Sequence, residues 1–284
     1  MDQAMKKLLC ITPIEHIEDL ENEMKKYFIF DKCASKKEKV KQKLLLEKHE
    51  IIFTNPNQQS FYIDENLLNG TQVKIICTAS TGTNHIDLDY CDIAGIDVIS
   101  ITKEIETLKQ ITSTAELAFC FLLSSIRKLI PANESAIRKE WQWQPFLGRQ
   151  IKDLTIGVVG VGRLGNMFID YCKAFGSKVI AYDPYAEKRK DITYVKNLNE
   201  LFSICDAISL HVHVNKETKY MINSKILSSC KKGIILINTS RGEIVSEKDI
   251  KDFLLSGHLS HYACDVLESE FQETISSPLL TLPN

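Results

Sequence analysis

The sequence predicts an α/β fold whose larger part is a doubly wound parallel sheet, and three observations support this prediction. Short apolar runs alternate with amphipathic stretches along nearly all of the 284 residues, which is typical of repeated βα units. Polar and charged residues directly follow the apolar runs, where an open parallel sheet places its ligand-binding groups. One continuous stretch, 156–183, has the order strand, glycine-rich turn, helix, strand and acid.

The stretch 156–183 reads IGVVGVGRLGNMFIDYCKAFGSKVIAYD and predicts a dinucleotide site of the Rossmann type. Gly160 permits the tight turn, Gly162 lets the backbone approach a pyrophosphate, and Gly165 lets helix and strand pack closely. The helix N-terminus offers unpaired N–H groups to the phosphates. Asp183, eighteen positions after Gly165, is placed to accept hydrogen bonds from a ribose diol. A purely structural turn is the alternative. The correct order of strand, glycines, helix, strand and acid argues against it.

The composition excludes several functional classes. A hydrophobic content of 44%, a charged content of 25% and a formal charge of −2 are those of an ordinary globular protein, so we expect no nucleic-acid partner. No apolar run reaches the length of a membrane span, and the N-terminus lacks the pattern of a signal peptide, so we expect no membrane partner. The nine cysteines include no CxxC pair. They indicate reduced, buried thiols in a cytoplasmic protein, and we expect no metal site.

The first hundred residues predict a smaller α/β domain with parallel character. The strands are expected at 8–12, 27–30, 51–54, 73–77 and 96–101. The turn after 73–77 has small residues, and the backbone N–H groups of Thr81 and Gly82 are candidates to hold an anion. A plain strand-to-helix turn fits the spacing equally well. The lysine-rich segment 35–48 is either a patch for an anionic partner or the solvated face of a helix. We favour the helix because acids flank it.

An unusually apolar helix is predicted over 113–130. Ser113 and Glu116 have the spacing of a capping box, and apolar residues cover most of the circumference after them. Such a helix is expected to be buried between the two domains. A more polar helix is expected over 132–143, followed by a segment whose two tryptophans are suited either to a subunit interface or to core packing.

In the second half, strands are expected at 206–212, 233–238 and 260–265, which completes the doubly wound sheet. Arg241 follows an apolar run and calls for an anionic partner, either a ligand carboxylate or an internal acid. Asp265 is suited to bind a carboxamide or to cap a turn, and Glu270 is a candidate site acid or a surface acid. Ligands of a doubly wound sheet bind beyond the carboxyl ends of the strands. The residues that lie at these ends are Asp183, His211, Val212, His213, Thr239, Arg241 and Asp265.

Six motifs occur along the chain in the order STGTNHIDL, the STAEL helix, GVGRLG with YDPY, ISLHVHVNKETKYMIN, INTSRGEIV and CDVLESE. These motifs and their order resemble the D-isomer-specific 2-hydroxyacid dehydrogenases, the family of phosphoglycerate, hydroxypyruvate and D-lactate dehydrogenases. The resemblance covers nearly the whole chain. It implies a flavodoxin-like substrate domain over 1–105, a Rossmann cofactor domain over 106–275, and the start of a return to the substrate domain over 276–284. It also implies a homodimer formed through 131–148.

The resemblance assigns the cofactor residues. NAD is implied because Asp183 is an acid at the ribose position, and the backbone at Arg163 and Leu164 would meet the pyrophosphate. Asp265 would hold the nicotinamide carboxamide. The side chains implied to line the cofactor are Val212, His213 and Thr239.

The resemblance also implies the reaction, a hydride transfer between the nicotinamide and C2 of a small D-2-hydroxy acid or its 2-keto form. The Thr81 and Gly82 amides with Arg241 would grip the substrate carboxylate and its C2 oxygen. Glu270 matches the acid that pairs with the family's catalytic histidine, orienting it and favouring its protonated form.

The sequence departs from the family pattern in three places. His213 and Phe271 stand where prolines are usual, and the chain stops at Asn284, before the segment that carries the general-base histidine. We expect the natural chain to continue past this point. The alternative is a truncated relative that binds NAD as a sensor or interaction protein, and a third hypothesis is another Rossmann enzyme such as a methyltransferase. The histidines judged to be poor replacements for the general base are His85, His211, His213, His258 and His261.

Overall fold

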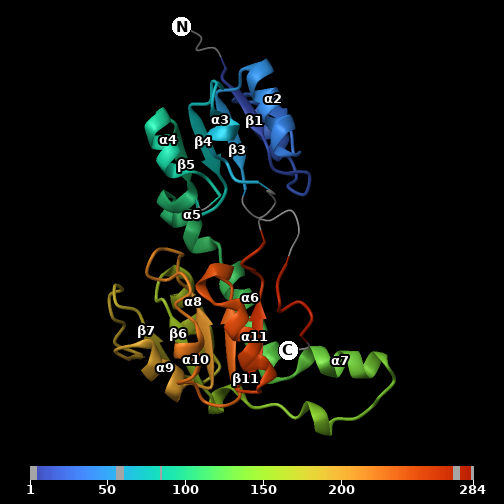
Figure 1. The fold of residues 1–284 in the computed structure, drawn as a ribbon, viewed down its shortest axis with the longest axis vertical. Coiled ribbons are helices and arrows are strands. Elements are labelled where there is room, and N and C mark those ends of the chain that lie inside the picture. Colours follow the sequence, from blue (N-terminus) through green and yellow to red (C-terminus); the bar gives the residue numbers. More distant parts are fainter. Residues whose placement is uncertain (1–4, 56–60, 84, 271–275, 283–284) are drawn as a thin grey trace. The chain divides into compact units, whose positions relative to one another are not determined.

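The structure is a computed structural model that describes residues 5–55, 61–83, 85–270 and 276–282. The chain forms two compact units, which Figure 1 shows. Unit 1 holds the described residues up to 110, and unit 2 holds the described residues from 111 onward. The division therefore falls five residues after the predicted domain boundary, and residues 276–282 are grouped with unit 2. The predicted return of the chain to the first domain stays a prediction, and Phe271 lies outside the described residues.

Unit 1 is a five-stranded parallel sheet with the order β2-β1-β3-β4-β5. This is the flavodoxin-like order that the family resemblance implied. The strands are β1 (Lys7–Cys10), β2 (Ile29–Lys32), β3 (Ile51–Thr54), β4 (Ile75–Thr78) and β5 (Asp97–Ser100). The helices are α1 (Leu20–Lys25), α2 (Lys37–Glu47), α3 (Glu65–Leu68), α4 (Leu88–Ala94) and α5 (Ile105–Gln110).

The two faces of this sheet have separate cores because side chains alternate along each strand. Leu9 of β1 packs in the core that α2, α3 and α4 cover, whereas Leu8 packs in the core that α1 covers. Helix α2 buries only Val40 and Leu44. Its other residues are exposed or half-buried, so the lysine-rich stretch is the solvated face of a helix, as the sequence indicated, and Lys37 pairs with Asp64 at 2.6 Å.

Unit 2 is a six-stranded parallel sheet with the order β11-β10-β9-β6-β7-β8, which is the doubly wound Rossmann order. The strands are β6 (Thr155–Val159), β7 (Lys178–Tyr182), β8 (Thr193–Tyr194), β9 (Ala207–Leu210), β10 (Ile234–Asn238) and β11 (Leu259–Cys264). The helices are α6 (Ser113–Ile126), α7 (Leu129–Ile137), α8 (Arg163–Ala174), α9 (Leu198–Ile204), α10 (Ser224–Leu227) and α11 (Glu247–Leu255). The order reverses between β6 and β9, so a ligand site is expected beyond the carboxyl ends of these two strands.

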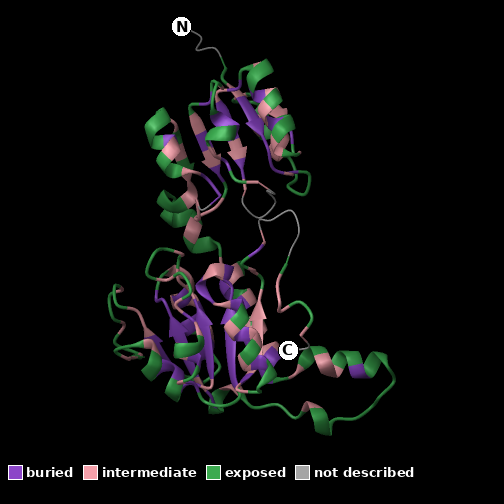
Figure 2. Ribbon diagram, in the orientation of Figure 1, coloured by how far each residue is buried: buried purple, intermediate pink, exposed green. Residues whose placement is uncertain are grey.

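Helices cover both faces of this sheet. Helices α6 and α8 contribute Leu122 and Phe168 to one core, and α9 and α11 contribute Phe202 and Ile250 to the other. The central strands are buried on both faces, as Figure 2 shows, which explains their unbroken apolar runs. Helix α11 begins after Ser246, because the Ser246 side chain accepts a hydrogen bond from the Asp249 N–H.

Two expectations about the apolar helix were wrong. The residue that caps α6 is Thr112, whose hydroxyl contacts the Glu116 carboxylate, and no side-chain cap bond from Ser113 forms. The helix is also not buried all round, because only one face, including Ala115 and Leu122, is enclosed. The other face, with an exposed Cys120, lines an open groove.

The segment after this helix leaves large apolar side chains in solvent. Helix α7 ends at Ile137, shorter than the predicted 132–143. Trp141 and Trp143 are 90% and 68% exposed, so core packing does not explain them. Figure 2 shows α7 and the following segment as mostly exposed.

Within the described part of the chain, no helix is both long and apolar enough to cross a membrane.

Candidate functional site

The two glycines between β6 and α8, and Gly165 in the first turn of α8, differ in the space around them. Gly160 has a φ of +90°, and a Cβ on it would lie 2.4 Å from the His211 carbonyl oxygen. A Cβ on Gly165 would lie 2.0 Å from the Gly160 carbonyl oxygen, so the helix packs directly on the turn. A Cβ on Gly162 would meet no atom within 4 Å. The space above Gly162 is therefore open, as backbone approach to a pyrophosphate requires.

Asp183 follows β7 and is held against this turn by three backbone N–H groups. Its Oδ2 accepts from the Val161 N–H at 2.8 Å, and its Oδ1 accepts from Tyr185 and Ala186 at 2.8 and 3.0 Å. An ionised carboxylate oxygen has room for two donors, so Oδ2 retains one acceptor site. Asp183 is therefore preorganised to accept a hydroxyl group in the position that the sequence predicted for a ribose.

The other selected residues lie where the sequence placed them, directly after β9, β10 and β11. Thr239 is 7% exposed, and its hydroxyl has no hydrogen-bond partner among the described residues. Ser240 beside it donates to the Leu210 carbonyl at 2.7 Å, which ties the end of β10 to the end of β9. A buried hydroxyl without a partner is costly, so Thr239 is suited to contact a bound ligand.

Arg241 and Glu270 are brought together by a close backbone crossing. A Cβ on Gly242 would lie 2.1 Å from the Leu267 carbonyl carbon and 2.2 Å from the Glu268 nitrogen. The chain after β11 therefore passes directly over the residue that follows Arg241. The Arg241 charge acts on the carboxyls of Asp265 and Glu270 and favours their ionised forms.

Burial dominates the titration of both acids. It raises the pKa of the Glu270 carboxyl above its ordinary value, and the Leu267 N–H and Arg241 oppose this shift. Burial likewise raises the pKa of Asp265, against the opposing effect of Arg241. Burial lowers the pKa of the His211 imidazole to about 4, so this ring is neutral at pH 7. A group with so low a pKa is a weak base, and the exclusion of His211 as the general base stays a prediction.

Sequence reasoning missed one acid that shapes this site. Glu247, the first residue of α11, is 5% exposed, and its Oε1 accepts from the Glu268 N–H at 2.8 Å. Its Oε2 accepts from the Ser277 hydroxyl at 2.7 Å. Glu247 thus holds the segment that carries Glu270. A glutamate in the first turn of a helix is common, so the sequence contained no signal that this one is a buried anchor.

The predicted anion turn lies in unit 1 after β4. The Thr78 hydroxyl contacts Ser80 Oγ at 2.9 Å and the ring of the buried His85 at 3.1 Å, and Ser80 donates to the Gly82 carbonyl at 2.7 Å. The N–H groups of Thr81 and Gly82 have no acceptor among the described residues. Hydrogen bonds therefore hold the carbonyls of the turn and leave these two donors available to an anion.

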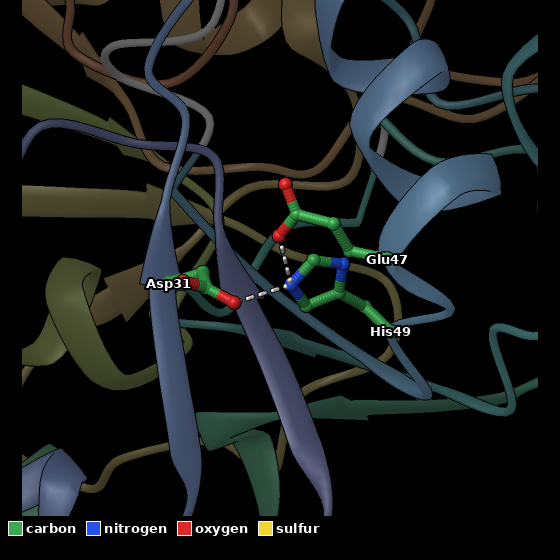
Figure 3. Close-up of side chains that lie close together, drawn as sticks. All are labelled: Asp31, Glu47 and His49. Carbon is green, nitrogen blue, oxygen red and sulfur yellow. Dashed lines mark hydrogen bonds and ion pairs between the residues drawn. The ribbon is translucent and has the colours of Figure 1, made fainter.

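Three other side chains in unit 1 are close enough together to share a metal ion, as Figure 3 shows. The buried His49 places Nε2 2.8 Å from Asp31 Oδ2 and 3.7 Å from Glu47 Oε2. Lys43 Nζ contacts both Glu47 oxygens at 2.7 Å. A metal on Nε2 would require a proton on His49 Nδ1, which has no partner among the described residues. We interpret the cluster as a structural ion-pair network, and the absence of a metal stays a prediction.

Unit 2 also has an open apolar groove of about 790 Å³ between α6, α7 and the end of α8. Phe119 packs edge-on against Tyr171 and Phe175 at ring-centroid distances of 5.9 and 5.0 Å. Leu123 and the exposed Cys120 complete its apolar wall. An exposed apolar surface of this kind is typical of a protein interface.

Comparisons with known proteins agree with this geometry. A family model described as D-isomer specific 2-hydroxyacid dehydrogenase, NAD binding domain, matches residues 119–284. The D-3-phosphoglycerate dehydrogenase of Methanocaldococcus jannaschii is 33% identical over 75% of this chain and 40% of its own length. The chloroplastic/mitochondrial formate dehydrogenase of Arabidopsis thaliana is 28% identical over 79% of this chain and 60% of its own length. The chain thus spans less than two thirds of these curated relatives.

A solved structure of D-lactate dehydrogenase from Aquifex aeolicus, complexed with NAD and lactic acid, is similar over 93% of this chain and 78% of that one. Its TM-score is 0.81 at 33% identity. The residues of unit 2 fit a dinucleotide, because the turn leaves space above Gly162, Asp183 retains an acceptor site and Thr239 has an unused hydroxyl.

Proposed function

Because the chain belongs to the D-isomer specific 2-hydroxyacid dehydrogenase family and carries its NAD-binding domain, we propose that it is an oxidoreductase for a small D-2-hydroxy acid. Hydride would pass between C2 of this acid or its 2-keto form and NAD. The observation that carries the proposal is the placement of Arg241 beside Asp265 and Glu270 at the carboxyl ends of β10 and β11. A guanidinium there suits a carboxylate substrate.

NAD, when bound, supplies the hydride acceptor or donor at its nicotinamide ring. The side chains Asp183 and Thr239 are proposed to hold hydroxyl or polar groups of the cofactor, and Asp265 its carboxamide. Backbone N–H groups at Arg163 and Leu164 are proposed to meet the pyrophosphate, because the first N–H groups of a helix have no partner within it. Val212 and His213, directly after β9, are proposed to line the cofactor.

For the substrate, we propose that Arg241 pairs with the carboxylate and polarises the C2 oxygen. In unit 1, the N–H groups of Thr81 and Gly82 are proposed to bind an anionic group of the substrate. Glu270 is proposed to orient the proton-transfer group and to favour its protonated form. Its burial supports this role, since an enclosed carboxylate interacts more strongly with a cationic partner than an exposed one does.

The test measures NADH binding by fluorescence and then NADH oxidation with glyoxylate, pyruvate and hydroxypyruvate. It also measures NAD reduction with D-lactate, L-lactate and formate. Both the 284-residue chain and any longer natural form of it are assayed. Turnover with a 2-keto acid, and with D-lactate over L-lactate, supports the proposal. NADH binding without turnover in either form contradicts it and favours the NAD-binding sensor. The absence of nicotinamide binding favours another Rossmann enzyme.

Substitution of Arg241 sharpens this test. Arg241→Gln is expected to lower kcat/KM for 2-keto acids about tenfold to a hundredfold, because a hydrogen bond to a charged group contributes about 1.5–3 kcal/mol. NADH affinity is expected to stay unchanged. Arg149→Gln is the matched control, since this exposed arginine pairs only with Asp206 in the described structure, and its activity should equal that of the wild type.

We also propose a homodimer in which a second copy covers the groove beside α6. The groove and the exposed Trp141 and Trp143 lie on the same unit. Two copies related by a twofold axis would bury both kinds of apolar surface at once. The mass in solution, measured by sedimentation velocity, tests this proposal, and a monomer at micromolar concentration contradicts it.

A cytoplasmic location is proposed as well. The nine cysteines are all free, and eight are buried or half-buried, which suits a reducing compartment. Immunolocalisation with cell fractionation tests this proposal, and recovery of the protein from an oxidising compartment contradicts it.

A further inference from the structure

One side chain reaches back from the first turns of α8 to the glycine-rich turn. Asn166 donates from Nδ2 to the Val161 carbonyl at 2.9 Å and to the Gly162 carbonyl at 3.0 Å. An amide NH₂ group has two hydrogens, so a single side chain contacts both carbonyls. The Gly162 carbonyl also accepts from the Asn166 backbone N–H at 2.9 Å, so it is the Val161 peptide that depends on the side chain.

A guanidinium fixes which way this amide faces. Arg189 Nη1 lies 3.1 Å from Asn166 Oδ1, and an arginine donates hydrogen bonds but accepts none. The oxygen of the Asn166 amide must therefore face Arg189, and the nitrogen must face the turn. Arg189 itself donates hydrogen bonds to Asp170 at 2.7 Å and to Asp191 at 2.8 and 3.0 Å. These acids raise the pKa of the guanidinium, which is charged throughout the ordinary pH range.

The direction of the carbonyls sets the direction of the neighbouring N–H groups. A trans peptide is planar, and its C=O and N–H bonds point in opposite directions. Because the Val161 carbonyl points at the Asn166 side chain, the N–H group of Gly162 points away from it. The preceding N–H, that of Val161, is occupied by Asp183. The Gly162 N–H thus faces away from the protein side chain that holds the turn.

We propose that Asn166, anchored by Arg189, is a positioning residue that aims the Gly162 N–H group at the pyrophosphate of the cofactor. The inference rests on the NAD-binding part of the proposed function and is independent of the substrate. It predicts a specific loss: without Asn166, the turn binds the pyrophosphate less well, whereas the adenosine part of the cofactor is bound as before.

The experiment compares two ligands by isothermal titration calorimetry on the whole chain. Adenosine lacks the pyrophosphate, and ADP-ribose contains it. Asn166→Ala and Arg189→Met are each expected to raise the Kd for ADP-ribose about fivefold to tenfold, the effect of one or two hydrogen bonds, and to change the Kd for adenosine less than about twofold. A merely structural role would change both affinities together.

Lys173→Met is the matched control for charge. Lys173 pairs with the same Asp191, so this variant removes one positive charge from the same cluster without touching Asn166. It is expected to leave the ratio of the two affinities unchanged. An equal change in Lys173→Met and Arg189→Met would overturn the inference, because the effect would then be one of charge.

Other outcomes are equally decisive. An unchanged ratio in Asn166→Ala overturns the inference while leaving the proposed function intact. A wild-type chain that binds neither adenosine nor ADP-ribose overturns the cofactor part of the proposed function and the inference with it. If Asn166→Ala does not fold, Arg189→Met decides alone, because the side chains of its partners Asp170 and Asp191 are 60% and 44% exposed.

Discussion

Gly242 lies directly beneath Leu267, so that a Cβ on Gly242 would stand 2.1 Å from the Leu267 carbonyl carbon. This contact brings the end of β10 and the chain after β11 together, and with them Arg241 and Glu270. The two backbones are therefore so close that no side chain fits at position 242 without displacing the 267–268 peptide. The contact therefore controls the geometry of the proposed substrate-binding residues.

Gly242→Ala is expected to displace residues 267–270 and to lower kcat about tenfold or more, because small displacements of reacting groups have large effects on rate. NADH affinity should stay near that of the wild type, since the glycine-rich turn is untouched. Gly257→Ala is the control, as it has a φ of +67° and no atom near its added Cβ. It should lower stability through backbone strain and leave kcat unchanged; an equal loss of kcat in both variants contradicts the prediction.

Alanine substitutions at Gly165 and Gly162 are expected to have different effects. The first should lower stability, and the second should weaken cofactor binding. Gly165→Ala meets the Gly160 carbonyl at 2.0 Å and should destabilise the protein by about 1–3 kcal/mol or more. Gly162→Ala meets no protein atom and should change the free energy of unfolding by less than about 1 kcal/mol. It should nevertheless weaken NADH binding about tenfold or more, because the methyl group occupies the pyrophosphate space. Urea unfolding and fluorescence titration measure the two effects.

Glu270→Gln is expected to stabilise the fold near neutral pH while lowering activity. The pKa of Glu270 is raised in the folded protein, so folding favours the protonated carboxyl. This contribution is fully present below the unfolded pKa of about 4.3 and is lost as pH rises through the folded pKa. The melting temperature of Glu270→Gln should exceed that of the wild type at pH 7, and the difference should disappear at pH 4. A lower melting temperature at pH 7 contradicts this prediction.

His211 makes the fold sensitive to mild acid. Its pKa is about 4 in the folded protein and 6.5 in the unfolded chain, so the unfolded state binds the extra proton between these values. Stability should fall as pH drops from about 6.5 toward 4, by up to roughly 3 kcal/mol at 1.36 kcal/mol per pKa unit. His211→Gln should flatten this dependence. Urea unfolding at pH 7.5 and pH 5 measures the difference, and parallel curves for both proteins contradict the prediction.

Cys120→Glu is expected to prevent association of two copies. The exposed Cys120 lies in the apolar groove beside α6, where a carboxylate would be buried without a partner in the dimer. Leu255→Glu, on the 65% exposed end of α11, is the control and should remain dimeric. Sedimentation velocity at micromolar concentration distinguishes them. Equal masses for both variants and the wild type contradict the assignment of this groove.

Local patterns in the sequence were enough to predict the elements around the cofactor. The strands β6 and β7 and the turn between them follow from apolar runs and glycine spacing, which act within a few residues. Ile51–Thr54 was predicted with its observed bounds for the same reason. The apolar helix was different: its composition indicated burial all round, but only the packing shows that one face is left open as a groove.

The sequence by itself determined the two α/β units, the order of the motifs and the position of each candidate residue after its strand. These features depend on residues that are neighbours in the chain, so a short stretch of sequence is enough to predict them. Only the tertiary structure decided that Glu247 anchors the segment of Glu270, and that Arg189 orients Asn166 over the glycine turn. These contacts join residues about twenty positions apart through single hydrogen bonds. No local pattern specifies such partners, because their geometry exists only after the sheet has formed.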